Sequence, residues 1–141
     1  MTRISRLKRF SSLALLGGLC CCMPALRAAE RMVSGQWEFS MTTEGATRTM
    51  RQCITADKAS EFNGDSKSGR EYAEKNAKGR CAINSYEIAG DTVSYSLACG
   101  STGIQSVTTF HGDTSDGSLI TTTEGKSVST QIKARRLGAC P

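Results

Sequence analysis

The chain has 141 residues, a length that suits one domain, and its 18 basic residues exceed its 13 acidic residues by five. Five of the basic residues and none of the acidic ones lie in the first 28 positions, which leaves 13 of each in the remainder. A remainder without net charge has no general electrostatic attraction for nucleic acid. The chain's 22% charged composition is not that of a strongly charged disordered protein. We therefore expect a folded protein with no nucleic-acid partner.

Residues 1–28 have the order of segments that defines a secretory signal peptide. Four basic residues precede the apolar run Phe10–Met23, and small residues lead to Ala28. We expect cleavage after Ala28, export to the periplasm, and a single all-β domain at 29–141. The apolar run is shorter than the roughly 20 residues that a membrane-spanning helix needs, so no transmembrane segment is predicted in the mature protein.

Three adjacent cysteines, Cys20, Cys21 and Cys22, raise the alternative of a lipid anchor. A lipoprotein signal places Gly, Ala or Ser immediately before the modified cysteine. Here the preceding residues are Leu19 and two of the cysteines themselves. Lipoprotein anchoring is therefore the minority alternative to release into the periplasm.

The mature chain begins with a predicted β-hairpin. Apolar and polar residues alternate along Ser34–Met41, which predicts a strand with Trp37 and Phe39 on one face. A Thr-Glu-Gly-Ala turn follows, and Thr47–Cys53 returns as the second strand. Pairing about this turn sets Phe39 opposite Met50, so that the apolar face continues across the pair. Trp37 is predicted to anchor the core.

A polar stretch with few large apolar groups follows and predicts two short helices. Thr55 can cap a helix that ends near Phe62. The segment Ser68–Glu71 has the spacing of a capping box and precedes a second helix over Tyr72–Ala77. The segment Asp65–Lys78 is expected to be the most mobile part of the mature chain.

The next hairpin has two competing registers. Strands are predicted at Cys81–Ile88 and Thr92–Cys99. A two-residue Gly90-Asp91 turn would pair Tyr86 with Tyr95. A three-residue loop centred on Gly90 would instead place Cys81 opposite Cys99. A β-bulge near one end would reconcile the two registers.

Three further strands complete the predicted fold, which is mainly β: an antiparallel meander of about seven strands, forming a curved sheet or partial barrel with a short helical insert. These strands are expected at Ile104–Phe110, Leu119–Glu124 and Val128–Ala134, with turns at His111–Asp113, Asp116–Gly117 and Glu124–Lys126.

Four cysteines remain after residue 28, and an even number in a small exported domain indicates two disulfides. Cys81 and Cys99 are equidistant from Gly90, so antiparallel pairing brings them together. We therefore predict Cys81–Cys99 and Cys53–Cys140, with Cys53–Cys81 and Cys99–Cys140 as the chief rival. The spacing includes no Cys-x-x-Cys motif, and no metal site is predicted.

Residues with the pattern of an active site are not found. His111 is the single histidine and lies in a predicted turn before Asp113, but no nucleophile is marked beside it. We predict no catalytic residue and no cofactor. Arg135 and Arg136 could protect an edge strand from aggregation or form a docking site.

Several short motifs occur along the chain in a characteristic order and spacing. They are Gly35-x-Trp37-Glu38, Cys53-Ile54-Thr55, Cys81, Gly90-Asp91-x-Val93-x-Tyr95-x-x-x-Cys99, Phe110-x-Gly112-Asp113 with Gly117, and Ala134-Arg135-Arg136-Leu137-Gly138-x-Cys140. Taken together, these motifs resemble the bacterial domain-of-unknown-function family thirty-six-seventeen, which comprises small exported proteins of Gram-negative bacteria. The resemblance implies a periplasmic or envelope location and no assigned activity.

Two functional hypotheses follow from these observations. The favoured one is a non-enzymatic binding or interaction module of the cell envelope, with a small apolar ligand or an envelope protein as its partner. The alternative is an envelope-associated enzyme or enzyme inhibitor that acts through His111 or scattered carboxylates. An apolar pocket would favour the first hypothesis, and a histidine beside a buried carboxylate and a hydroxyl would favour the second.

Overall fold

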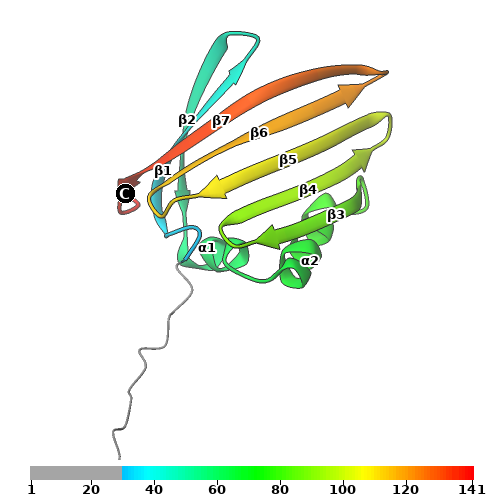
Figure 1. Cartoon of the computed structure of the whole chain (residues 1–141). Coiled ribbons are helices and arrows are strands. Elements are labelled where there is room, and N and C mark those ends of the chain that lie inside the picture. The colour runs from blue at the N-terminus through cyan, green and yellow to red at the C-terminus, as the bar shows by residue number, and fades with distance from the viewer. Residues whose placement is uncertain (1–29) are drawn as a thin grey trace, which may run out of the picture.

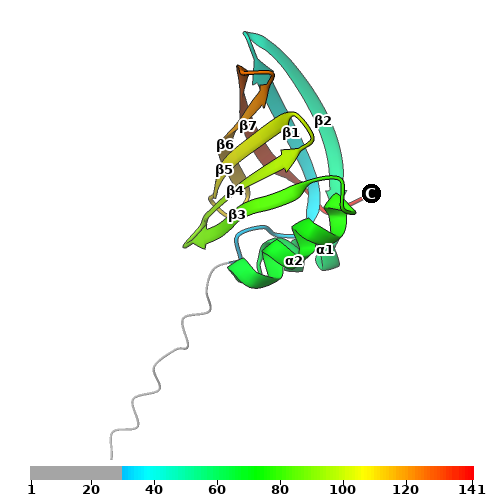
Figure 2. The ribbon, with the colours of Figure 1, turned by 90° about the vertical axis from the view of Figure 1, so that its right-hand side faces the viewer.

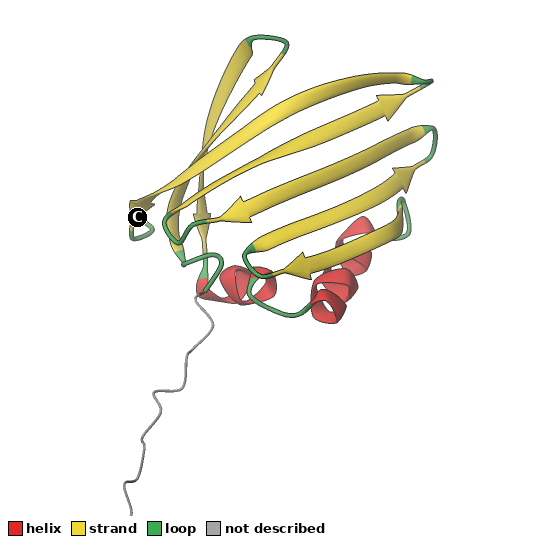
Figure 3. Cartoon of the chain, in the orientation of Figure 1, coloured by secondary structure: helices red, strands yellow, loops and turns green. Residues whose placement is uncertain are grey.

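The computed structural model describes residues 30–141 as one β-sheet and two helices (Figures 1 and 3). The predicted signal peptide and its cleavage site lie outside the described residues. Helices α1 (Ala56–Phe62) and α2 (Ser66–Ala77) lie between the second and third strands. The predicted seven-stranded antiparallel meander with a helical insert is confirmed. The strands are β1 (Gly35–Thr43), β2 (Ala46–Ile54), β3 (Ala82–Ala89), β4 (Thr92–Cys99), β5 (Thr102–Phe110), β6 (Thr114–Thr123) and β7 (Lys126–Gly138).

The sheet is open and strongly curved. Its strand order is β2-β1-β7-β6-β5-β4-β3, so β1 lies between β2 and the last strand, and β2 and β3 are the two edges. Figure 2 shows the curvature, with both helices at one end of the sheet. Because α1 and α2 connect the two edge strands, they lie across the concave side at that end (Figures 1 and 2).

The first hairpin has the predicted register. Phe39 is opposite Met50, and the apolar face of β1 continues onto β2. Trp37 is completely buried, and its indole N–H donates to the Val33 carbonyl over 2.9 Å. Trp37 is therefore the core residue that its place in the alternating pattern predicts. The cluster of buried side chains around it is Met32, Ile54, Ala59, Val93, Phe110 and Ala134.

Both helices form, but the second begins earlier than predicted. Thr55 caps α1 as expected. The capping-box prediction for α2 is wrong: Asp65 is the N-cap, and its carboxylate accepts a hydrogen bond from the Ser68 backbone N–H over 2.8 Å. An ionised cap also interacts favourably with the positive end of the helix dipole, which explains why Asp65 prevails over Ser68.

The β3–β4 hairpin contains the bulge that the two registers required. Tyr86 is opposite Tyr95 near the turn, and the register shifts between Ile83 and Ser85. The shift returns the strand ends to the alignment in which Cys81 and Cys99 form a disulfide. The second disulfide joins Cys53 to Cys140. The predicted pairing is therefore the one that the structure shows, and the rival pairing is not.

The predicted turn at Asp116–Gly117 is wrong, because both residues lie inside β6. The chain turns earlier, between β5 and Thr114. A Cβ atom at Gly117 would overlap the Val107 carbonyl oxygen of β5. The glycine therefore permits a close approach between strands and does not mark a turn.

The proposed edge-strand role of Arg135 and Arg136 is also wrong. Both residues belong to β7, which pairs with β1 on one side and β6 on the other. Arg135 forms an ion pair with Glu38 of β1, and Arg136 donates to the Ser34 carbonyl over 2.8 Å. These arginines tie the interior strand to the start of β1.

Candidate functional site

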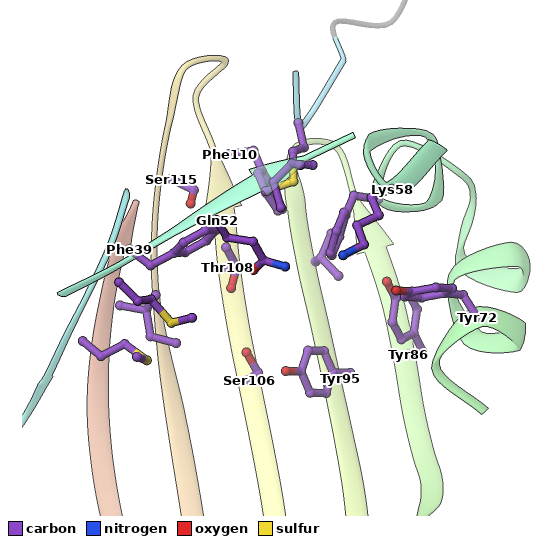
Figure 4. Close-up of a pocket in the computed structure, with 17 residues that line it drawn as sticks. Phe39, Gln52, Lys58, Tyr72, Tyr86, Tyr95, Ser106, Thr108, Phe110 and Ser115 are labelled. Atoms are coloured by element: carbon purple, nitrogen blue, oxygen red, sulfur yellow. The ribbon is translucent and has the colours of Figure 1, made fainter. Parts of the chain in front are cut away.

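The concave face of the sheet contains a groove with a volume of about 350 Å³, shown in Figure 4. All seven strands, both helices and the segment before β1 contribute residues to its lining. Side chains alternate between the two faces of each strand, so every second residue points into the groove. The groove therefore collects residues that are far apart in the sequence, such as Phe39, Tyr95 and Ile132.

Small side chains on the central strands leave the groove open. Ser106 and Thr108 of β5 and Ser115 of β6 line it, where larger apolar residues would have filled the space (Figure 4). Ser106 and Ser115 are buried polar residues. Larger side chains stand on β1 and β2, where Phe39, Met41, Met50 and Ile54 line the groove.

The opposite wall is aromatic. Tyr86 of β3 and Tyr95 of β4 stack with their ring centroids 6.2 Å apart and an interplanar angle of 10°. Phe62 of α1 and Tyr72 of α2 meet edge to face, with ring centroids 6.4 Å apart. Burial raises the pKa of Tyr86 above its ordinary value, and Tyr95 adds to this effect.

Packing of α2 against β3 positions this aromatic wall. Gly69 is buried, and a Cβ atom there would overlap the Tyr86 ring, so the glycine lets the helix approach the ring directly. Ser66 accepts a hydrogen bond from the Ile88 backbone N–H over 2.9 Å, and Arg70 donates to the Ile83 carbonyl over 2.8 Å. Side chains of α2 thus pair with one backbone N–H and one backbone carbonyl of the edge strand β3.

The segment before β1 helps to close one end of the groove. Met32 is buried and lines the groove. Its backbone is held by Asn63, whose side chain accepts from the Met32 N–H over 2.9 Å and donates to the Met32 carbonyl over 2.8 Å. Arg31 donates to the carbonyls of Phe62 and Gly64. These bonds fix the segment to the helical insert.

Lys58 of α1 is the one charged side chain among the described residues that line the groove. Figure 4 shows its ammonium group extending into the opening, and Gln52 of β2 also lines the groove. Lys58 forms no ion pair with any side chain that the structure describes. The groove therefore combines an apolar lining with one cation and a few neutral hydrogen-bonding groups.

His111 lies away from the groove, on the loop between β5 and β6. Its Nε2 is 2.8 Å from Asp116 Oδ1, and the two side chains are 52% and 61% exposed. Within the described part of the chain, no hydroxyl is hydrogen-bonded to this imidazole. The pair lacks the nucleophile and the buried carboxylate that the enzyme hypothesis requires.

The carboxylate of Glu38 does not line the groove either. Glu38 alternates with the inward residues of β1 and lies between Arg51 of β2 and Arg135 of β7. It contacts Arg51 Nε at 3.0 Å and Arg135 Nη2 at 2.6 Å. Hydrogen bonds from Arg135 and then Arg51 lower the pKa of Glu38. Its geometry is that of a structural ion-pair network that joins three strands.

Sequence reasoning did not identify the groove residues. The alternation in β4 placed Tyr95 on an apolar face, but Lys58 and Ser106 carried no recognisable signal. Lys58 belongs to a short polar helix, and Ser106 to a strand rich in hydroxyl residues. Among residues 30–141, no cluster of three or more His, Cys, Asp or Glu side chains is placed to hold a metal ion.

Within residues 30–141, neither helix has the length and apolar character needed to cross a membrane. Comparison with curated proteins and with solved structures finds no match. A family model described as "Protein of unknown function (DUF3617)" matches residues 32–140, which include every strand, both helices and all four disulfide-forming cysteines. The chain therefore belongs to the DUF3617 family.

Proposed function

We propose that this protein is an exported, non-enzymatic module of the bacterial envelope that binds a small apolar molecule in its concave groove. The observation that carries this proposal is the open apolar groove between the aromatic and methionine-bearing walls. The signal-peptide pattern of residues 1–28 supports export to the periplasm.

The dimensions and lining of the groove agree with ligand binding. Sites for small molecules occupy about 300–1,000 Å³ and combine apolar and aromatic walls with a few polar groups. The groove has about 350 Å³ and this kind of lining. Met32, Met41 and Met50 contribute flexible, polarisable side chains that can adapt to a ligand's shape. A ligand that covers these side chains would gain the free energy of removing apolar surface from water.

The proposal is tested with a neutral apolar dye, N-phenylnaphthylamine, which becomes fluorescent in apolar surroundings. The full precursor is expressed and the exported protein is purified. We expect saturable binding, and we expect Ser106→Phe, which fills the groove from β5, to abolish it. The matched control is Gln105→Phe, because Gln105 is the neighbouring residue of β5, is exposed and does not line the groove.

Thr108→Phe is a second groove-filling variant in case the first does not fold, and fluorescence of the buried Trp37 reports folding in each case. Absence of dye binding by the native protein would refute the proposal. Undiminished binding by folded groove variants would refute it as well.

Export is tested separately by mass spectrometry of the purified protein. We expect the mature chain to begin at Ala29 without a lipid. An acylated N-terminus at Cys20, Cys21 or Cys22 would instead show lipoprotein anchoring, and retention of residues 1–28 would show that the segment is not removed.

A further inference from the structure

We propose that the ligand of the groove is a single-chain amphiphile with an anionic headgroup, and that Lys58 binds this headgroup. The inference rests on the proposed function, because it assigns the chemistry of the molecule that the groove would bind. It is carried by the charge and the hydrogen-bonding character of the groove's polar side chains.

The charge of the lining is one-sided. Lys58 is positive, and no Asp or Glu is among the described residues that line the groove. Glu38 of β1 does not line the groove, and it forms ion pairs with two arginines, Arg51 and Arg135. Among the described side chains Lys58 has no carboxylate partner, and such a cation beside an apolar cavity is complementary to one negative charge on an otherwise apolar molecule.

The neighbouring polar groups can also donate hydrogen bonds. Gln52 and Tyr86 line the groove together with Lys58, and Figure 4 shows the polar ends of these three side chains extending toward the open space. An ammonium group is a donor only, and an amide NH₂ and a phenol each supply donors. A tyrosine phenol is protonated at neutral pH and can therefore donate. Such a set favours an oxyanion over a cationic headgroup.

The size of the groove indicates one chain. Its volume of about 350 Å³ lies at the lower end of the range for small-molecule sites, which extends to about 1,000 Å³. A lipid with several acyl chains would exceed it. The adaptable methionine side chains and the stacked rings of Tyr86 and Tyr95 offer a wall for an alkyl chain, which has no polar groups to satisfy.

A headgroup bound by a lysine can be a carboxylate or a phosphate, because an ammonium group acts as a compact charge without the planar geometry of a guanidinium. A fatty acid and a single-chain lipid phosphate therefore share the proposed chemistry. Their relative affinities, measured side by side, distinguish the two sources.

The experiment measures displacement of N-phenylnaphthylamine by four ligands with the same chain: dodecanoate, dodecyl phosphate, dodecanol and dodecyltrimethylammonium, each below its micellar concentration. We expect at least one of the two anions to bind about tenfold more tightly than dodecanol, the effect of a charge-assisted hydrogen bond of about 1.4 kcal/mol. The anion with the higher affinity identifies the headgroup.

Lys58→Met tests the residue itself. We expect this variant to lose the preference for anions and to keep its affinity for the dye and for dodecanol. The control is Lys67→Met on α2, because Lys67 does not line the groove and its side chain is 85% exposed. We expect the control to retain the full preference.

The outcomes separate this inference from the proposed function. If the dye binds in the groove but neither anion exceeds dodecanol, the headgroup assignment is overturned and the apolar site stands. The same holds if dodecyltrimethylammonium competes as well as the anions, or if Lys58→Met leaves their advantage unchanged. If the dye does not bind at all, the proposed function fails and this inference fails with it.

Discussion

Removing the Cys53–Cys140 disulfide should destabilise the sheet more than removing Cys81–Cys99. Cys53 lies near the end of β2 and Cys140 follows β7, and both of these strands pair with β1. The bond therefore connects the two neighbours of β1 and joins the N-terminal hairpin to the C-terminus. Cys81–Cys99 instead closes one hairpin between β3 and β4.

The expected magnitudes follow from the lengths of the two loops. The sequence separations are 87 residues for Cys53–Cys140 and 18 for Cys81–Cys99. The loss of loop-closure entropy in the unfolded chain then corresponds to about 4.6 kcal/mol for the longer loop and about 3.2 kcal/mol for the shorter one. Each double variant keeps only the other disulfide, so the free energies of unfolding of the two variants should differ by about 1.4 kcal/mol.

Both cysteines of a pair are replaced by alanine, so that no free thiol remains. Urea unfolding is followed by the fluorescence of Trp37, which is the single tryptophan of the chain and is completely buried. Linear extrapolation then yields the free energy of unfolding of each variant. If the Cys81/Cys99 double variant were destabilised as much as the Cys53/Cys140 variant, or more, loop length would not be the controlling quantity and this reasoning would be refuted.

Three other predictions follow from the same structure. Gly69→Ala should lower the free energy of unfolding by about 1–2 kcal/mol, because overlap with the Tyr86 ring outweighs the roughly 1 kcal/mol of gained helix propensity. In a chain that also carries Tyr86→Ala, Gly69→Ala should instead raise the free energy of unfolding, because the ring is gone and the helix propensity remains. A double-mutant cycle measures the effect of Gly69→Ala with and without the ring. Arg135 lowers the pKa of Glu38 from its ordinary value of 4.5, so this carboxylate stabilises the fold above that pH and the contribution is lost as the pH falls. As the pH is lowered through the acid range, the urea midpoint of Glu38→Gln should therefore fall less steeply than that of the native protein. The same dependence on pH in both proteins would contradict the assignment. Amide hydrogen exchange should be fastest at Asp65–Lys78, since Gly69 is the one buried residue of α2, whereas protection equal to that of the strands would contradict this expectation.

The hairpins were predictable because their determinants are local. Alternation of side chains has a period of two, and a short turn fixes which residues face each other, so Phe39 and Met50 could be paired from the sequence. The conflict between two registers around Gly90 even indicated the bulge that the structure contains. The Cys81–Cys99 pair follows from the same geometry, and the second disulfide is then the remaining choice.

Local patterns of residues thus predicted the antiparallel fold, the buried position of Trp37 and the disulfide pairing. Other features depend on which strands become neighbours, and these became visible only in the folded structure. Gly117 resembles a turn glycine until β5 is placed against it, and Arg135 resembles an edge residue until β1 pairs with β7. The groove belongs to this second class. Ser106 leaves space only because the sheet curves and brings walls from β1, β2, β3 and β4 around it, and Lys58 faces that space only because α1 connects the two edges of the sheet. Curvature and strand order are properties of the assembled sheet, which no local pattern of residues encodes.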